Sequence, residues 1–175
     1  MFRYCKSCSM NKPSKKRLSS SLEDYLEAIY HLEQDNRVAR TKDIAQFLDV
    51  NMSSVTGALK GLAKKGMVEH SPYSYVTLTD VGKKIAADVV RRHEALTDFL
   101  VKVLGIASRQ ADENACRMEH AVDSKITHRL VRFLQFLEDC PLGDEGLIKG
   151  FRYYCEHGRL REDCQGHIEK CSSND

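Results

Sequence analysis

Six side chains that could bind a metal ion lie in three places along this chain, and two of these places have helical spacing. The six are Asp24, Glu27, His93, Cys116, Glu119 and His120. The first two are three residues apart and the last three follow an i, i+3, i+4 pattern, so each group would share one face of a helix. Taken singly, each of these residues could have an ordinary role. Asp24 and Glu27 could be solvated surface charges, His93 a core or surface histidine, and Cys116 a small buried apolar residue.

Together the six side chains offer oxygen, nitrogen and sulfur donors, and this mixture narrows the choice of ion. It is too soft for magnesium or calcium and too rich in oxygen for a structural zinc site. The pattern therefore predicts a divalent first-row transition metal. The thiolate favours iron(II), cobalt, nickel or zinc over manganese. Iron(II) is the expected ion, because cellular availability rather than affinity order decides selectivity.

A second set of polar and basic residues has the arrangement of a DNA-binding motif. Two predicted helices, separated by a turn at 50–54, are followed by β-prone runs at 67–68 and 76–78 around a turn at Tyr73. With the helix before them, this is the order of a winged helix-turn-helix, whose last helix enters the major groove. The candidate DNA contacts are Arg40, Thr41, Ser53, Ser54, Thr56, Lys60, Lys64 and Tyr73.

These candidate contacts differ in what they would recognise. Serine and threonine hydroxyls bind bases or phosphates with little discrimination. The lysines are placed to meet phosphates, and phosphate contacts make affinity depend on salt. A protein-interaction module made of three small helices and a hairpin is the alternative.

Hydrophobic periodicity predicts the helices of the N-terminal half. The first begins at Leu22, after a cap at Ser20 or Ser21, and ends at the pair 35–36. The second starts after a cap at Thr41 and buries Phe47 together with its other apolar residues. The third ends at Gly66, which would take the position after the C-cap.

The same pattern continues in the C-terminal half. A long helix is predicted from Asp80 to about Leu104, capped by Thr79, with Val81 on its apolar face and Gly105 ending it. Two more helices are expected at about 109–121 and 124–138. The protein is therefore expected to be mainly α-helical. Its stretches are a basic tail (1–20), a winged helix-turn-helix (21–79), an all-helical domain (80–141) and a cysteine-containing tail (142–175).

Composition limits the classes of protein that fit. The formal net charge is only +2, although the first twenty residues hold six basic side chains and no acid. Such an arm is typical of a solvated tail and sometimes contacts phosphates. The chain has no apolar run of about 18 residues, so no membrane span is predicted, and the N-terminus lacks a secretory signal. Seven cysteines, an odd number, argue against a disulfide framework. We therefore expect a cytoplasmic protein.

The remaining cysteines indicate a possible second site. Near the C-terminus the candidates are Cys155, His157, Cys164, His167 and Cys171, and Cys5 and Cys8 stand at C-x-x-C spacing in the first tail. These residues could hold a second metal or form a redox site. A reduced, solvated tail is the alternative, because the spacing matches no established motif.

Several segments resemble the diphtheria toxin repressor family of iron- and manganese-dependent regulators. The resemblance runs from about Leu22 to Pro141 and is carried by the segments 23–30, 53–56, 78–82, 92–94 and 115–120. The last, Ala-Cys-Arg-Met-Glu-His, is similar to a hallmark of the iron-responsive branch. The resemblance implies a winged helix-turn-helix, a helical dimerisation domain and a metal site between them.

Residue by residue, the resemblance is a hybrid of two branches. Cys116, Glu119 and His120 match the metal-binding helix of the iron branch, whereas Asp24, Glu27 and His93 match ligands of the manganese branch. The iron branch also has an ancillary site that uses His93 with two further residues. Thr97 and Asp112 stand at those two positions here, so His93 is assigned to the primary site, which would hold one ion or a pair. No SH3-like third domain is expected.

The resemblance implies a homodimeric repressor of metal-uptake genes that binds operator DNA when metal is bound. The ion would be iron(II), with manganese(II) next and zinc, cobalt or nickel as surrogates. A manganese-responsive regulator of the same architecture and a thiol-based redox regulator are the alternatives. A metal-dependent hydrolase is the competing class of function, but the chain has no evident deep-pocket scaffold, so we expect no enzyme.

Overall fold

The computed structural model describes residues 18–36, 38–70, 75–139 and 143–160. The chain divides into two compact units, Met1–Thr77 and Leu78–Asp175. Within the described residues no helix has both the length and the apolar character needed to cross a membrane.

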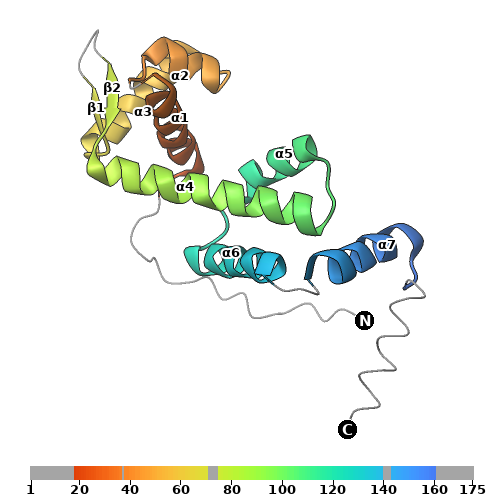
Figure 1. The fold of residues 1–175 in the computed structure, drawn as a ribbon. Helices are drawn as coiled ribbons and strands as arrows, with labels where there is room; N and C mark the ends of the chain where they lie inside the picture. Colours follow the sequence, from red (N-terminus) through yellow and green to blue (C-terminus); the bar gives the residue numbers. More distant parts are fainter. Residues whose placement is uncertain (1–17, 37, 71–74, 140–142, 161–175) are drawn as a thin grey trace, which may run out of the picture. The chain divides into compact units, whose positions relative to one another are not determined.

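The first unit is a winged helix-turn-helix. Its elements are α1 (Ser20–Asn36), α2 (Thr41–Phe47), α3 (Met52–Lys64), β1 (Val68–His70) and β2 (Val76–Leu78), the last of which extends one residue past the unit boundary (Figure 1). The two strands pair, and Ala39 adds an antiparallel bridge to Val76. The helices bury a shared apolar core that includes Leu26, Ile29, Ile44, Val55, Leu59 and Leu62. The predicted fold of this half is confirmed, and Tyr73 at the predicted wing lies outside the described residues.

The residues that cap the helices differ in part from those that the sequence predicts. Asn51, which the sequence places in a turn, caps α3 by accepting a hydrogen bond from the backbone N–H of Ser54. Arg40 holds the N-cap position of α2 without a side-chain hydrogen bond, and Thr41 is the first helical residue. Gly66 follows the C-cap of α3 with φ +68°, a conformation that favours glycine.

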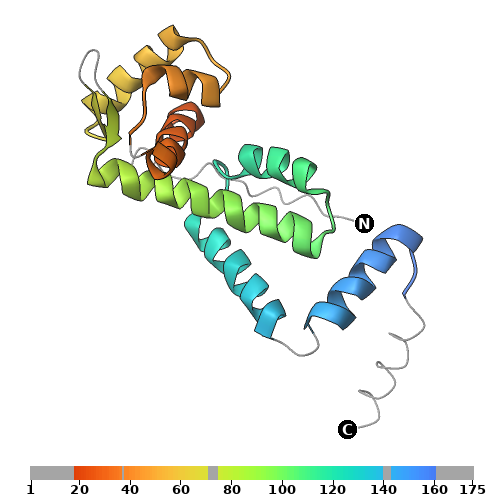
Figure 2. The same ribbon diagram turned by 45° about the horizontal axis from the view of Figure 1, so that its top comes forward.

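The second unit is all helical. Its elements are α4 (Asp80–Asp98), the π-helical turn η1 (Phe99–Val103), α5 (Ser108–Met118), α6 (Ser124–Asp139), the π-helical turn η2 (Gly143–Ile148) and α7 (Lys149–His157). α5 and α6 both pack against α4 (Figure 2). Thr79 caps α4 as predicted, accepting from the N–H of Gly82 at 3.2 Å. The mainly α-helical fold class is thus confirmed.

Two apolar residues that were expected to be buried lie at the surface instead. Phe47 is 51% exposed and Val81 is 54% exposed. Phe47 is the last residue of a seven-residue helix and stacks on the ring of His31, with centroids 6.0 Å apart. Val81 directly precedes Gly82, which is buried together with Ala86, Val89 and Leu96, so Val81 lies beside the buried face of α4 and not on it. An apolar residue next to the buried face fits the helical pattern in the sequence almost as well as one on it.

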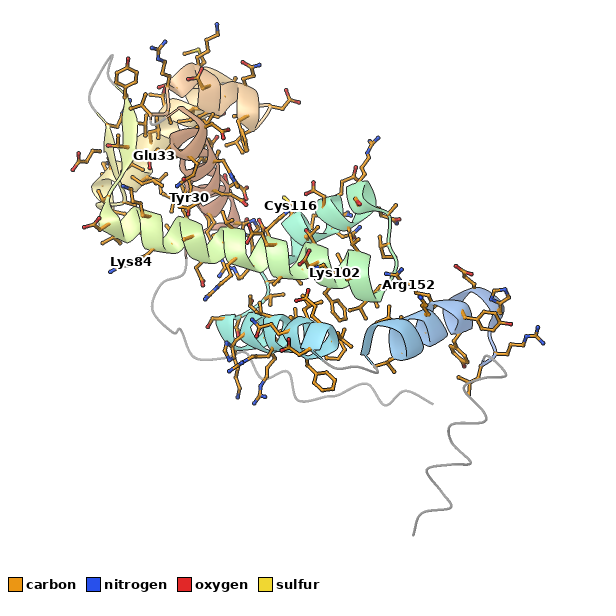
Figure 3. All side chains as sticks on the ribbon, viewed as in Figure 1. Tyr30, Glu33, Lys84, Lys102, Cys116 and Arg152 are labelled. Carbon is orange, nitrogen blue, oxygen red and sulfur yellow. The ribbon has the colours of Figure 1, made fainter. Side chains whose placement is uncertain are left out.

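α7 departs from the expectation of a tail beyond residue 142. Ile148, immediately before it, joins a buried cluster with Val103, Leu134 and Leu137. Arg152 donates hydrogen bonds to the carbonyls of Val101, at 2.9 Å, and Lys102 (Figure 3). These contacts hold the short segment in place. Because the partners lie about fifty residues earlier in the chain, no local sequence pattern predicts them.

Candidate metal centre and nucleic-acid interface

Three of the predicted metal ligands meet in the second unit. His93 lies on α4, Glu119 is the C-cap of α5 and His120 follows it. Glu119 Oε2 lies 2.8 Å from His93 Nδ1, and Glu119 Oε1 lies 3.3 Å from His120 Nε2. Two imidazoles from different parts of the unit therefore face one carboxylate.

The burial of Glu119 makes this group unusual. Its side chain is fully buried, yet within the described part of the chain its Oε1 atom accepts no hydrogen bond of good geometry. A buried ionised carboxylate is costly unless a cation or several hydrogen bonds compensate it. The two histidines can supply that compensation as cations or, when neutral, can bind a metal ion together with the carboxylate. The donor chemistry therefore fits a divalent transition metal.

Asp112, which is not among the six predicted ligands, is a further neighbour of this group. Its Oδ1 atom lies 3.1 Å from His93 Nε2, so both ring nitrogens of His93 face a carboxylate. A carboxylate on the second nitrogen fixes the orientation and tautomer of a metal-binding imidazole. Helical spacing in the sequence already indicates this position, because Asp112, Cys116 and Glu119 stand at i, i+4 and i+7 and therefore share one face of a helix.

The other three predicted ligands occupy different surroundings. Cys116 lies on α5 one turn before Glu119 and is exposed (Figure 3). Asp24 and Glu27 belong to the first unit, where both are partly buried on one face of α1. The carboxylate of Glu27 lies 3.9 Å from His31 Nε2, one helical turn away. The six predicted ligands are thus shared between the units, two in the first and four in the second.

At the start of α3, the side chains of the predicted serine contacts are held by Asn51. Asn51 Oδ1 accepts from the hydroxyl of Ser53 at 2.6 Å, from the hydroxyl of Ser54 at 2.8 Å and from the N–H of Ser54 at 2.8 Å. The Thr56 hydroxyl donates to the carbonyl of Met52 at 2.8 Å. The hydroxyls at the start of α3 are therefore held in place by local hydrogen bonds while remaining near the surface.

The basic candidates lie on the exposed side of the same unit. Lys60 and Lys64 are exposed, whereas Val55, Leu59 and Leu62 of the same helix are buried. Arg40 is exposed and contacts Tyr75, a residue that is not among the predicted DNA contacts. The hydrogen bond to the Tyr75 hydroxyl is the main cause that raises the pKa of Arg40 above its ordinary value. Thr41 is partly buried.

The second set of cysteines and histidines is described only in part. Cys155 on α7 is exposed. His157 stacks on the ring of Tyr153, with centroids 4.1 Å apart, and its Nδ1 lies 3.0 Å from the Tyr153 carbonyl. Cys5, Cys8, Cys164, His167 and Cys171 lie outside the described residues. A second metal or redox site therefore stays a prediction.

Comparison with known protein families assigns both halves of the chain. Residues 17–76 match the N-terminal DNA binding domain of iron dependent repressors. Residues 79–147 match the metal binding and dimerisation domain of the same proteins. The two matches together span the winged helix-turn-helix and the helices that carry His93, Glu119 and His120.

Individual relatives agree with the family matches. An uncharacterized HTH-type transcriptional regulator of Methanocaldococcus jannaschii is 37% identical over 123 residues, which are 70% of this chain and 98% of that protein. The HTH-type transcriptional regulator MntR of Shouchella clausii is 34% identical over 119 residues, 68% of this chain and 82% of its own length. A solved manganese-dependent transcriptional repressor in complex with manganese has a TM-score of 0.61 and 34% identity over 66% of this chain. This chain spans about half of that structure, 53% of its length.

Proposed function

Because this chain belongs to the iron-dependent repressor family, the diphtheria toxin repressor family of metal-dependent transcriptional regulators, we propose that it represses metal-uptake genes when iron(II) is bound. The family is non-enzymatic, and the matched domains make the chain a metal-dependent DNA-binding regulator. Its partners are operator DNA and a second copy of the chain. We place its action in the cytoplasm, where operator DNA is accessible.

The proposed metal centre uses residues from both units, namely Asp24, Glu27, His93, Cys116, Glu119 and His120. The observation that carries this proposal is the fully buried carboxylate of Glu119, which faces His93 and His120 with an oxygen that lacks a good hydrogen bond among the described residues. A bound ion would supply positive charge to this group. Asp112 would orient His93 from its far side, at 3.1 Å.

Iron(II) is proposed because of Cys116. A thiolate is a softer ligand than manganese prefers, and the imidazoles suit iron, zinc and nickel equally well. Manganese(II) is the second candidate, because similar solved structures include a manganese-dependent transcriptional repressor and a manganese regulator, and because oxygen donors outnumber the single sulfur. Zinc, cobalt and nickel would act as surrogates in vitro.

The proposed mechanism couples metal binding to DNA binding through the two units. Without an ion, the carboxylates of Asp24, Glu27 and Glu119 would repel one another if drawn together, so the first unit is free to move relative to the dimer core. With the ion bound, ligands from both units hold the first unit at one position. The two α3 helices of a dimer then reach successive major grooves, about 34 Å apart. DNA binding therefore rises with the population of this state.

Metal dependence of DNA binding tests this function. Chelator-stripped protein would be titrated with Fe(II) under anaerobic conditions, and in parallel with Mn(II), Zn(II), Co(II) and Ni(II), against a duplex selected from a random-sequence library. Restored binding with Fe(II), at lower free ion concentration than with Mn(II), is the expected result. Restoration by oxidant with no added metal would instead indicate a thiol-based redox regulator. The DNA-contact roles of Arg40, Thr41, Ser53, Ser54, Thr56, Lys60, Lys64 and Tyr73 belong to the same proposal.

A further inference from the structure

The antiparallel bridge between Ala39 and Val76 sets the register of the residues beside it. Val76 N–H donates to the Ala39 carbonyl at 2.8 Å, and Ala39 N–H donates to the Val76 carbonyl at 3.4 Å. This is a hydrogen-bonded pair, so the next pair, Arg40 and Tyr75, lies directly opposite without ladder hydrogen bonds. Side chains in such a pair approach most closely.

The same register sends the two pairs to opposite faces. Ala39 and Val76 are fully buried in the core of the first unit, whereas Arg40 and Tyr75 are exposed. Alternation along a strand gives this result, because successive side chains point to opposite sides. The backbone that fixes the wing to the helical core therefore also presents an arginine and a tyrosine together on the surface.

The contact between these two side chains is specific. The guanidinium carbon of Arg40 lies 5.2 Å from the centroid of the Tyr75 ring, within the range of a cation–π interaction. Arg40 Nη2 also donates a hydrogen bond to the Tyr75 hydroxyl at 3.3 Å. One aromatic side chain thus restricts both the position and the rotation of the guanidinium. Four of its five N–H groups are left for other acceptors.

We propose that Tyr75 is a positioning residue for DNA binding, which holds Arg40 in the orientation that contacts a backbone phosphate. This inference rests on the proposed function of the first unit. In this motif the helix that Arg40 precedes crosses the DNA backbone. An arginine already restricted by an aromatic ring loses less rotamer freedom when it binds a phosphate, and this raises affinity without a further contact. Because Tyr75 acts through Arg40, its substitution is expected to have no effect once Arg40 is gone.

A double-mutant cycle tests this dependence. The variants are Arg40→Ala, Tyr75→Leu, Tyr75→Phe and the double variant Arg40→Ala/Tyr75→Leu, each loaded with Mn(II) and titrated against the selected duplex at several salt concentrations. Arg109→Ala is the matched control, because it removes an arginine that is 92% exposed on α5 of the other unit. Thermal unfolding would confirm that each variant is folded.

The expected results separate positioning from direct contact. Tyr75→Leu should weaken binding about twofold to fivefold, the size of an exposed cation–π interaction. Tyr75→Phe should lose less, because the ring remains. Arg40→Ala should lower the slope of log affinity against log salt by about one per protomer, whereas Tyr75→Leu should keep most of the slope. The double variant should bind as Arg40→Ala does.

Three results would overturn the inference. Additive losses in the double variant would mean that Tyr75 contacts DNA itself. Tighter binding by Tyr75→Leu would mean that the tyrosine withdraws Arg40 from DNA. Unchanged binding by Tyr75→Leu would mean that the tyrosine does not position Arg40, and unchanged binding by Arg40→Ala would remove Arg40 from the interface. Failure of the proposed function is distinguishable from all three, because wild-type protein would then show no metal-dependent binding to the duplex.

Discussion

At the scale of single residues, Glu119 is the side chain on which the proposed metal centre depends most. It is fully buried, and its two oxygens face imidazoles at 2.8 Å and 3.3 Å. Burial of this kind is unfavourable for an uncompensated carboxylate and favourable for a ligand of a cation. The prediction from helical spacing therefore identified a residue whose surroundings are unusual.

Glu119→Gln is expected to abolish the stabilisation of the protein by metal. At a metal concentration about a hundredfold above Kd, binding stabilises the folded state by about 2.7 kcal/mol, or a rise in Tm of about 5–10 °C for a protein of this size. The variant should show no such rise, although its metal-free Tm should not fall, because a buried charge has been removed. Glu113→Gln on the exposed side of α5 is the control. A full metal-induced shift in Glu119→Gln would exclude Glu119 as a ligand.

Cys116 determines the metal preference in this account. Cys116→Glu replaces a soft thiolate by a hard carboxylate at an exposed position, which leaves the fold unaffected. The affinity for Mn(II) relative to Co(II) should rise, as measured by competition calorimetry with the two ions. An unchanged ratio would mean that the thiol does not bind the ion, and the proposal of iron(II) over manganese(II) would lose its basis.

At the scale of elements, Asn51 shows where capping patterns in the sequence are ambiguous. Asparagine and serine are both strong N-caps, so the segment Asn51-Met52-Ser53-Ser54 allowed several starts for the helix. The structure selects Asn51, whose Oδ1 accepts from both serines that follow it. The start of α3 is thus organised by Asn51, a residue that the sequence predicts only as part of a turn at 50–54.

Asn51 substitutions should separate stability from DNA binding. Asn51→Ala removes the cap and should lower the free energy of unfolding by about 1 kcal/mol. Asn51→Asp keeps a capping oxygen, so stability should be retained, but its negative charge beside DNA phosphates should weaken binding. Chemical denaturation and DNA titration of both variants provide the measurement. Equal DNA affinity of Asn51→Asp and wild type would place the start of α3 away from DNA.

The sequence predicts the helices α1 to α6, and α1, α3 and α4 each bury a stripe of residues that repeats every three or four positions. α7 could not be predicted in this way. It is held by Ile148 in a cluster with α6 and η1, and by Arg152 on the carbonyls of Val101 and Lys102. Helical spacing in the sequence is enough to place Asp112 beside the predicted ligands. The contact between Arg40 and Tyr75, in contrast, depends on the register of the wing strands, which the sequence does not give.

Arg152 makes the C-terminal segment part of the second unit. A Cβ built at Gly105 would lie 3.2 Å from Arg152 Nε, and Gly105 has φ +70°. Gly105→Ala is therefore expected to destabilise the protein by about 1–2 kcal/mol through backbone strain. It should also increase hydrogen exchange in α7, which Arg152→Ala should reproduce without the strain. Unaltered exchange in α7 for both variants would mean that α7 does not dock through Arg152.

At the scale of the whole molecule, the proposed function requires free-energy coupling between a metal site and a DNA-binding surface. In the proposed centre, ligands from two units would allow the ion to favour one arrangement of those units. Such coupling is typically 1–3 kcal/mol, or about fivefold to 150-fold in affinity, and it must be reciprocal. The ion must therefore bind more tightly to DNA-bound protein by the factor with which DNA binds more tightly to metal-bound protein.

The most direct test is the affinity of the wild-type protein for the selected duplex, measured with saturating metal and with chelator at constant ionic strength. We expect at least about fivefold tighter binding with metal, and no difference for Glu119→Gln. Equal affinities of the wild type in metal and in chelator would exclude the proposed coupling, because the metal centre would then have no influence on DNA binding.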